Sequence, residues 1–342
     1  MRAGRWPAWA GALSAGARAW ALALLGLTTL VPAAEPTGAT RPPLTLAVAD
    51  LLYAAPVLVA EALDFFAAEG LPLKVTHCAV GRVCLQQLLD GRTQFATVAD
   101  TPIALASFTR QDFAIIATTT VSGSELRLVA RQDRGIRRAA DLKGRRIGFI
   151  AGTSSHYYIE TFLLFHGLKA AEVTLVPLQA TATAAALVHG EVDAAGLFEP
   201  AGRDAVRQLG PQALVLPSPR FFTLTFNLVS AGRGAGVSAD DEVRLLRAVR
   251  RAEVLIHTDP ERARRILAGA LKMDPGKVAE AWGDFVFRLQ LGQPLINTLE
   301  AQARWALREG LAPAGARMPN FLDLIDVEPL RRVDPQAMRL VR

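Results

Sequence analysis

The sequence lacks the short motifs that mark many hydrolases and nucleotide-binding enzymes. It contains no Gly-x-Ser-x-Gly elbow, no His-Glu-x-x-His and no Gly-x-x-x-x-Gly-Lys-Ser/Thr phosphate loop. A reactive serine, a catalytic zinc ion and a phosphate-binding loop are each recognised by one of these spacings. We therefore expect a protein that binds its ligand without covalent chemistry, and we expect neither a metal nor a cofactor.

Cysteine is scarce: the chain has only Cys78 and Cys84. In an oxidising compartment, two cysteines this close can form a disulfide if the backbone turns sharply between them. A metal site that recruits His77 is an alternative, but the pair lacks the second half of any zinc spacing. Two separate buried thiols are the third alternative.

Long apolar runs are also missing, because the uncharged stretch 19–31 falls short of the roughly 20 residues that span a bilayer. It follows a basic start and leads into Val31-Pro32-Ala33, a small-residue cleavage pattern. We expect residues 1–33 to be a cleaved signal peptide and 34–43 a linker, with a retained anchor helix as the alternative. No cysteine directly follows the run, so a lipid anchor is not indicated.

Basic side chains only slightly outnumber acidic ones. The formal net charge is +6, and removal of Arg2, Arg5 and Arg18 with the leader would leave 35 basic against 32 acidic side chains. This balance predicts no nucleic-acid surface. The length of 342 residues and the 51% hydrophobic content allow about two globular units with a large core.

From residue 44 onward, short β-rich runs alternate with stretches whose apolar residues recur at helical spacing. This alternation is typical of parallel sheets covered by helices. From residue 238 the pattern changes to long helices, with Asp259-Pro260 and Asp274-Pro275 as start signals. The expected strands are 44–49, 73–77, 95–99, 114–119, 146–150, 173–176 and 194–198, and the expected helices are 56–69, 83–89, 155–166, 182–189, 238–258, 260–270, 275–283 and 296–309.

The chain contains an internal repeat at a constant offset of 99 residues. Residues 88–96 lead to Asp100, and residues 187–195 lead to Glu199. In each copy we expect a helix that ends on glycine, then a buried strand with an acidic residue at its carboxyl end. Open α/β sheets bind ligands at such strand ends, so a cleft between two units of this kind is the natural site.

Four segments carry a resemblance to a known family. They are Asp-Leu-Lys-Gly-Arg-Arg-Ile-Gly at 141–148, Gly-Thr-Ser-Ser-His-Tyr at 152–157, Ala-Ala-Leu-Val-His-Gly-Glu-Val-Asp-Ala at 185–194, and Phe198-Glu199-Pro200. Taken together, these segments make the chain resemble the nitrate/taurine/alkanesulfonate-type solute-binding proteins of ABC importers from about residue 44 to residue 310. Those proteins are related to the family that binds or synthesises the pyrimidine precursor of thiamine. Many relatives carry tryptophan where this chain has Phe198.

The resemblance implies a type II periplasmic binding fold, in which two doubly wound α/β lobes are joined by a two-crossing hinge and a helical layer ends the chain. We place the crossings near Ala130 and Phe226. Lobe one then comprises 44–129 and 227–342, and lobe two comprises 130–226.

The implied function is capture of a small polar molecule, such as a sulfonate, taurine or nitrate, in a cleft between the lobes. The protein would be a periplasmic monomer that delivers this solute to an ABC permease and ATPase at the cytoplasmic membrane. One alternative is an enzyme on the same fold, of the thiamine-pyrimidine synthase or menaquinone-pathway type. Another is a periplasmic sensor subunit.

The segment after the expected strand 146–150 is the first candidate for ligand contact. Its hydroxyl and amide groups could hold an anionic oxygen at the positive end of the next helix. Ordinary N-capping is the alternative. The candidate residues here are Gly152, Thr153, Ser154 and Ser155, followed by His156 and Tyr157, which could add a donor and a stacking face or could pack between the lobes.

Two acidic residues are expected to face each other across the cleft. Asp100 and the adjacent Thr101 are candidate ligand contacts, and the alternative for Asp100, which precedes Thr101-Pro102, is that it caps a helix. Glu199 is a poorer cap and could accept hydrogen bonds from an amine or an amino-heterocycle. Two opposed acids do not suit a purely anionic ligand, so they indicate a zwitterion, an amine-bearing solute or a neutral heterocycle.

Three further residues complete the predicted site. Arg82 begins a helix, where it could pair with a sulfonate, carboxylate or phosphate, although most single arginines are simply solvated. Tyr53 could provide an aromatic wall, and Asn227 could line the hinge face.

Overall fold

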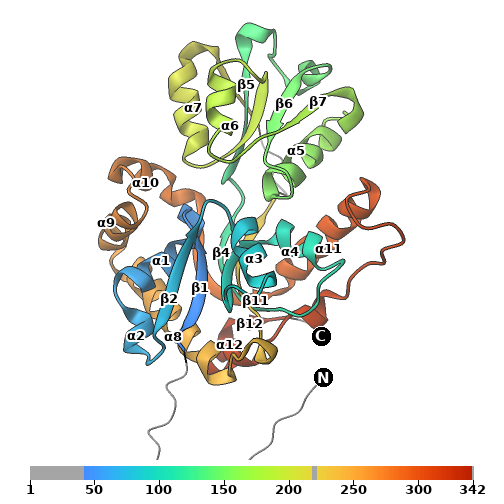
Figure 1. Ribbon diagram of the computed structural model, residues 1–342. Helices are drawn as coiled ribbons and strands as arrows, with labels where there is room; N and C mark the ends of the chain where they lie inside the picture. Colours follow the sequence, from blue (N-terminus) through green and yellow to red (C-terminus); the bar gives the residue numbers. More distant parts are fainter. Residues whose placement is uncertain (1–41, 218–221, 341–342) are drawn as a thin grey trace, which may run out of the picture. The chain divides into compact units, whose positions relative to one another are not determined.

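The computed structural model describes residues 42–217 and 222–340. The predicted signal peptide, 1–33, and all but the last two residues of the predicted linker, 34–43, lie outside the described residues. In the described part, no helix is both long enough and apolar enough to cross a membrane. The strands form two separate sheets, each with its own covering helices (Figure 1).

The first sheet has seven strands in the order β12-β11-β4-β10-β3-β1-β2. β1 pairs in parallel with β2 and β3, whereas β10 pairs antiparallel with both β3 and β4. The bounds are β1 (Leu44–Ala49), β2 (Leu73–Cys78), β3 (Phe95–Ala99), β4 (Ala114–Ser122), β10 (Leu224–Ser230), β11 (Val286–Gly292) and β12 (Met338–Arg339).

The second sheet has five strands in the order β7-β6-β8-β5-β9. β6 pairs in parallel with β7 and β8, and β5 pairs antiparallel with β8 and β9. The strands are β5 (Leu126–Arg131), β6 (Arg146–Phe149), β7 (Thr174–Pro177), β8 (Ala194–Phe198) and β9 (Ala213–Leu216), and the helices packed on them are α5 (Ser154–Phe165), α6 (Thr183–Val188) and α7 (Ala201–Leu209) (Figure 1).

The helices of the first sheet come from both ends of the described chain. α8 starts on a capping box, in which Ser238 accepts from the Asp241 amide, and the predicted Asp-Pro signals do start α9 and α10. The helices are α1 (Ala55–Ala62), α2 (Phe65–Ala68), α3 (Gly81–Leu89), α4 (Asp100–Ala106), α8 (Ala239–Thr258), α9 (Pro260–Ala270), α10 (Pro275–Ala281), α11 (Gln293–Arg308) and α12 (Glu328–Val333).

The repeat predicted from the sequence is present in the structure. α3 ends before Gly91 and leads to β3, and α6 ends before Gly190 and leads to β8. Both glycines have positive φ, of 72° and 78°, a conformation that other residues rarely adopt. The two copies lie in different sheets, as the two-lobe prediction requires.

The expectation of parallel sheets was incomplete, because both sheets are mixed. Five strands were missed: β5, β9, β10 and β11, each of which pairs antiparallel with a neighbour, and the two-residue β12, which pairs in parallel with β11. The prediction relied on the alternation of strands and helices. This pattern indicates only those strands that are connected through a crossover helix. The missed strands follow turns or 3-10 segments or enter directly from the other sheet, so they lack that signal.

Both crossings between the sheets lie earlier than predicted. The chain leaves the first sheet after Ser122 and enters the second at Leu126, and it returns between Leu216 and Leu224. The predicted positions, Ala130 and Phe226, lie inside β5 and β10. The Ser122 hydroxyl ends β4, because its oxygen accepts from the amides of Ser124 and Glu125. We therefore use lobe one for 42–122 with 224–340, and lobe two for 126–216.

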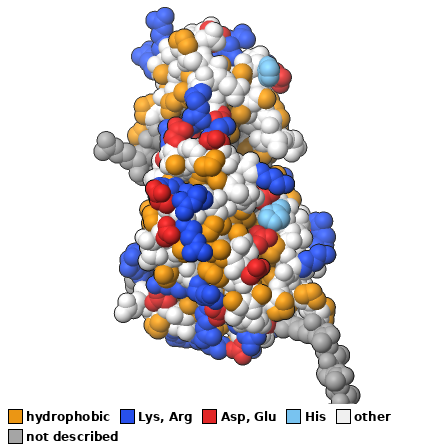
Figure 2. Space-filling model, turned by 90° about the vertical axis from the view of Figure 1, so that its left-hand side faces the viewer, with side chains coloured by type: hydrophobic (Ala, Val, Ile, Leu, Met, Phe, Trp, Pro, Cys, Tyr) orange, Lys and Arg blue, Asp and Glu red, His pale blue; other side chains and the backbone are white. Residues whose placement is uncertain are grey.

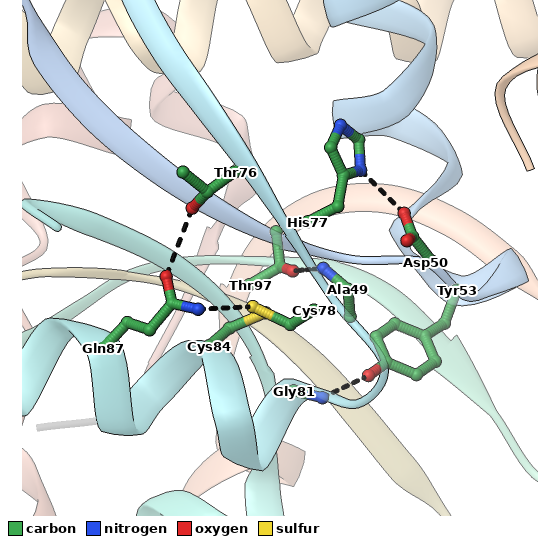
Figure 3. Close-up of a disulfide and its surroundings, with 10 residues drawn as sticks. All are labelled: Ala49, Asp50, Tyr53, Thr76, His77, Cys78, Gly81, Cys84, Gln87 and Thr97. Atoms are coloured by element: carbon green, nitrogen blue, oxygen red, sulfur yellow. Dashed lines mark hydrogen bonds and ion pairs between the residues drawn. A yellow bond between two sulfur atoms is a disulfide. The ribbon is translucent and has the colours of Figure 1, made fainter. Parts of the chain in front are cut away.

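Cys78 and Cys84 form the predicted disulfide between the end of β2 and the first turns of α3 (Figure 3). Their Cα atoms are 5.7 Å apart, and Gln87 Nε2 lies 3.6 Å from Cys78 Sγ. His77 turns toward Asp50, with 2.7 Å between Nδ1 and Oδ1. Among the described residues no three potential metal ligands gather, so the alternative of a metal site with His77 has no support in the structure.

We predict that the double substitution Cys78→Ser/Cys84→Ser lowers the free energy of unfolding by about 2 kcal/mol, since the short closed loop no longer restricts the unfolded chain. Denaturant unfolding of the mature protein measures this difference. Reduction of the wild type with dithiothreitol should produce the same loss. A double variant as stable as the oxidised wild type would contradict the prediction.

Candidate functional site

The N-terminus of α5 is built by the segment that the sequence analysis selected first. Gly152 adopts φ 67°, which turns the chain after β6, and Thr153 caps the helix by accepting from the Ser155 amide at 3.2 Å. The Thr153 hydroxyl donates to the Ile150 carbonyl at 2.7 Å, and the Ser155 hydroxyl donates to the Gly196 carbonyl at 2.9 Å. The hydroxyls of Thr153 and Ser155 therefore hold the helix against lobe two, as the capping alternative proposed.

Ser154 is the residue of this segment that reaches the other lobe. Its hydroxyl lies 3.4 Å from the hydroxyl of Thr101, in the first turn of α4, and both side chains are fully buried. The first N–H groups of a helix have no partner within the helix, and they carry partial positive charge. The N-terminus of the twelve-residue α5 thus faces lobe one.

Asp100 is a structural centre of lobe one rather than an open cleft residue. Its carboxylate accepts from the Thr101 amide, the Gln302 side chain and both the amide and hydroxyl of Thr225. Complete burial raises the pKa of Asp100 to about 6, although these donors act against the shift. Asn227 belongs to the same interior, where it accepts from the Thr118 hydroxyl at 2.7 Å and donates to the Thr225 carbonyl.

Tyr53 is also an interior residue. Its ring stacks on Phe226 with 3.7 Å between the centroids, and its hydroxyl accepts from the Gly81 amide at 3.1 Å (Figure 3). Burial raises the pKa of Tyr53. The predicted aromatic wall is therefore part of the packing that joins the first loop to the start of α3.

Of the remaining candidates, Arg82, Gly152 and Tyr157 line cavities between the lobes. Arg82 and Gly152 border a cavity of about 250 Å³, and Arg82 also borders one of about 190 Å³ next to Ile150. Tyr157 borders a third cavity, of about 350 Å³, whose other walls come from the second crossing and α11. His156 points elsewhere, since its Nε2 lies 3.0 Å from Glu160 and its ring packs between Phe149 and Trp305.

Glu199 is fully buried and neutralised within lobe two. Its carboxylate pairs with Arg127 and with Arg203, whose Nη1 lies 3.1 Å away. Phe198 precedes it at the end of β8 and is half-buried. The predicted role as a free acceptor therefore does not fit this arrangement, because both oxygens already have partners.

Arg203 continues from Glu199 across to lobe one, where it lies 2.6 Å from Asp284. Two more ion pairs join α7 to α10 in the same region, Arg207 with Glu280 at 2.8 Å and Lys277 with Asp204 at 2.7 Å. We call this group of six charged side chains the interlobe ion-pair cluster. On the opposite side, Trp305 Nε1 of lobe one donates to Glu160 of lobe two at 2.7 Å.

Glu125 was not among the residues predicted from the sequence; it lies in the first crossing and is 2% exposed. Its Oε2 is buried without a hydrogen-bond partner among the described residues. Burial raises its pKa well above the usual value, and the charges of Asp100, Glu199 and Asp284 act in the same direction. The turn Ser122-Gly123-Ser124-Glu125 between two apolar runs was the available signal, but the strand after it had not been recognised.

The architecture is that of the two-lobed periplasmic binding proteins. A family model described as NMT1/THI5 like matches residues 52–263, more than half of the chain, so the chain belongs to this family. The alkanesulfonate-binding protein SsuA from Xanthomonas axonopodis pv. citri, bound to MOPS, has the same fold, with a TM-score of 0.71 at 18% identity over 89% of this chain and 100% of that chain.

Curated relatives are similar over part of their length. The taurine-binding periplasmic protein of Escherichia coli is 28% identical over 149 residues, which is 43% of this chain and 46% of that protein. A Brucella abortus protein named as a binding protein is 29% identical over 163 residues, 47% of this chain and 50% of that protein. The chain thus spans about half the length of the curated relatives it matches.

We predict that Arg203→Gln destabilises the protein by about 3 kcal/mol, because Glu199 stays buried with a single cation and Asp284 keeps only its hydrogen bond from Ser124. Arg207→Gln is the matched control on the same helix, and it should cost less than about 1 kcal/mol because Arg207 is half exposed. Denaturant unfolding of both variants measures the difference. Equal losses would show that burial does not set the strength of the interlobe ion-pair cluster.

Proposed function

We propose that this protein is the exported solute-binding component of an ABC importer and that it binds a small organosulfonate between its lobes. The observation that carries the proposal is the N-terminus of α5, which faces lobe one at the Thr101–Ser154 contact. A helix N-terminus favours an anionic group such as a sulfonate. The family and the names of the taurine-binding and alkanesulfonate-binding relatives support this substrate class.

The two crossings provide the movement that such a receptor needs. Both are short segments between sheets, so the lobes can turn about them while each sheet keeps its pairing. A ligand shifts this equilibrium only if it binds the closed arrangement more tightly than the open one. Our proposed binding residues are Thr101 and Ser154, which meet between the lobes, and Arg82 and Tyr157, which line separate cavities there.

The proposal also covers location and partners. A receptor of this class works in the periplasm as a monomer and presents the closed form to a permease coupled to an ATPase. Acidic and basic side chains are interspersed on the face drawn in Figure 2, so docking would depend on local complementarity rather than on one large charged field.

An enzyme on the same fold is the second candidate. The desulfurization enzyme DSZB has a TM-score of 0.62 to this chain at 19% identity, which shows that the fold also supports catalysis. In this chain both cysteines are joined in the disulfide, so a thiol nucleophile would require its reduction. This observation favours a binding protein.

We predict that short alkanesulfonates or aminoalkanesulfonates raise the melting temperature of the mature protein without being consumed. At a hundred times the dissociation constant, the ligand adds about 2.7 kcal/mol to the stability. Ser154→Leu should abolish the shift, because the larger side chain separates α5 from Thr101.

The matched control is Ser238→Leu, which removes the cap of α8 far from this contact and should lower stability by about 1 kcal/mol while keeping the ligand-dependent shift. Mass spectrometry of the incubated ligand tests for turnover. If no sulfonate, nitrate, pyrimidine or aromatic carboxylate shifts the melting temperature, the proposed function is wrong.

A further inference from the structure

Trp305 of α11 is a lobe-one side chain whose ring packs against lobe two. The ring meets His156 edge-on, with 5.1 Å between the centroids, and it meets Tyr157 at 5.2 Å. Both of these residues belong to the first turn of α5. Trp305 is 1% exposed, and these contacts bury part of its ring between the two lobes.

The indole N–H of Trp305 needs an acceptor because it is buried. An indole nitrogen can only donate, and a buried donor that is left unpaired lowers stability. Its acceptor is Oε2 of Glu160 in α5, at 2.7 Å. The other carboxylate oxygen, Oε1, lies 3.0 Å from Nε2 of His156. Glu160 therefore has one oxygen bonded within lobe two and the other bonded to lobe one.

The carboxylate of Glu160 is charged at neutral pH although only 9% of the side chain is exposed. Burial acts to raise its pKa, but hydrogen bonds from His156 and Trp305 outweigh this effect, so the pKa lies below the usual value. Hydrogen bonds to a charged acceptor are roughly twice as strong as bonds between neutral groups. The bond between Trp305 and Glu160 is therefore a strong one for a contact between lobes.

This contact lies beside a cavity between the lobes. The cavity of about 350 Å³ is bordered by Tyr157 of α5 and by Ala301 of α11. Trp305 is one helical turn beyond Ala301 on α11, and Glu160 is nearly one turn beyond Tyr157 on α5. The two helices that enclose the cavity are therefore also joined by the bond between Trp305 and Glu160.

We propose that Trp305 and Glu160 form a latch between the lobes, and that this Trp305 latch sets how much of the protein is closed before any solute binds. The closed arrangement gains the hydrogen bond and the burial of the ring, and the open one loses both. A larger closed fraction strengthens the apparent affinity for every solute that needs closure. The proposal therefore does not depend on which solute binds.

The Trp305 latch differs from the interlobe ion-pair cluster in its exposure. Arg207 and Glu280 of that cluster are about half exposed, so water and salt screen their attraction. Trp305 and the side chain of Glu160 are buried, so their bond is screened much less. The latch should keep its strength at salt concentrations that weaken such exposed pairs.

Small-angle X-ray scattering of the ligand-free mature protein tests the latch. Trp305→Ala removes both the ring and its N–H, so we expect the ratio of closed to open protein to fall about tenfold or more and the radius of gyration to increase. Trp282→Ala is the matched control, because Trp282 packs against Phe287 within lobe one. This control should lose stability but keep the scattering curve of the wild type.

Exchange of the indole N–H with solvent, followed by NMR, measures smaller populations of the open form. Without the predicted signal peptide the chain has two tryptophans, and the spectrum of Trp282→Phe assigns their signals. In Glu160→Ala the closed form leaves the donors of Trp305 and His156 unpaired, so the Trp305 N–H should exchange about tenfold faster or more. Glu300→Ala removes a carboxylate of α11 that is 43% exposed, and it should leave this rate unchanged.

Circular dichroism and thermal unfolding show whether Trp305→Ala stays folded. If it does not, the scattering and the exchange of Glu160→Ala, which is altered in the other lobe, decide. The latch is wrong if folded Trp305→Ala scatters like the wild type, or if Glu160→Ala leaves the exchange of the Trp305 N–H unchanged. Both experiments use ligand-free protein, so a protein that opens as expected but binds no sulfonate would overturn the proposed function and keep the latch.

Discussion

The buried carboxylate of Asp100 is the interaction on which the arrangement of lobe one depends. It joins the start of α4, the strand β10 and the helix α11, which are far apart in the sequence. Because β10 directly follows the second crossing, this centre also fixes where the chain re-enters lobe one. Thr101 stands next to it and makes the contact with α5, so the geometry between the lobes depends on the same carboxylate.

The buried acidic side chains near Asp100 differ in the partners that they have. Asp100 is held by hydrogen bonds inside lobe one and Glu199 is paired with two arginines of lobe two, and the interlobe ion-pair cluster connects the lobes. Glu125 is the exception, because it lies in the crossing itself and its Oε2 has no hydrogen-bond partner among the described residues. The acids that are paired within a lobe are therefore distinct from this one, which lies between the two sheets.

The sequence predicted the fold well and the site less well. The internal repeat, the glycines that end helices and the Asp-Pro pairs are local signals, and they predicted the parallel strands and the long helices. The short spacing of Cys78 and Cys84 is also local, and it predicted the disulfide. The missed strands have no such marker, and missing β5 also hid the turn that carries Glu125. Whether Asp100 is a ligand contact or a structural centre depends on Gln302, some two hundred residues away, and no local pattern reveals that contact.

The disulfide has a consequence for how the protein should be prepared. Arg82 lies inside the loop that Cys78 and Cys84 close, and it borders two of the cavities between the lobes. The bond therefore sets the position of a cation at the proposed ligand site as well as tying β2 to α3. Protein produced in a reducing cytoplasm would carry Arg82 on an open loop, so affinities measured on it would not describe the oxidised form.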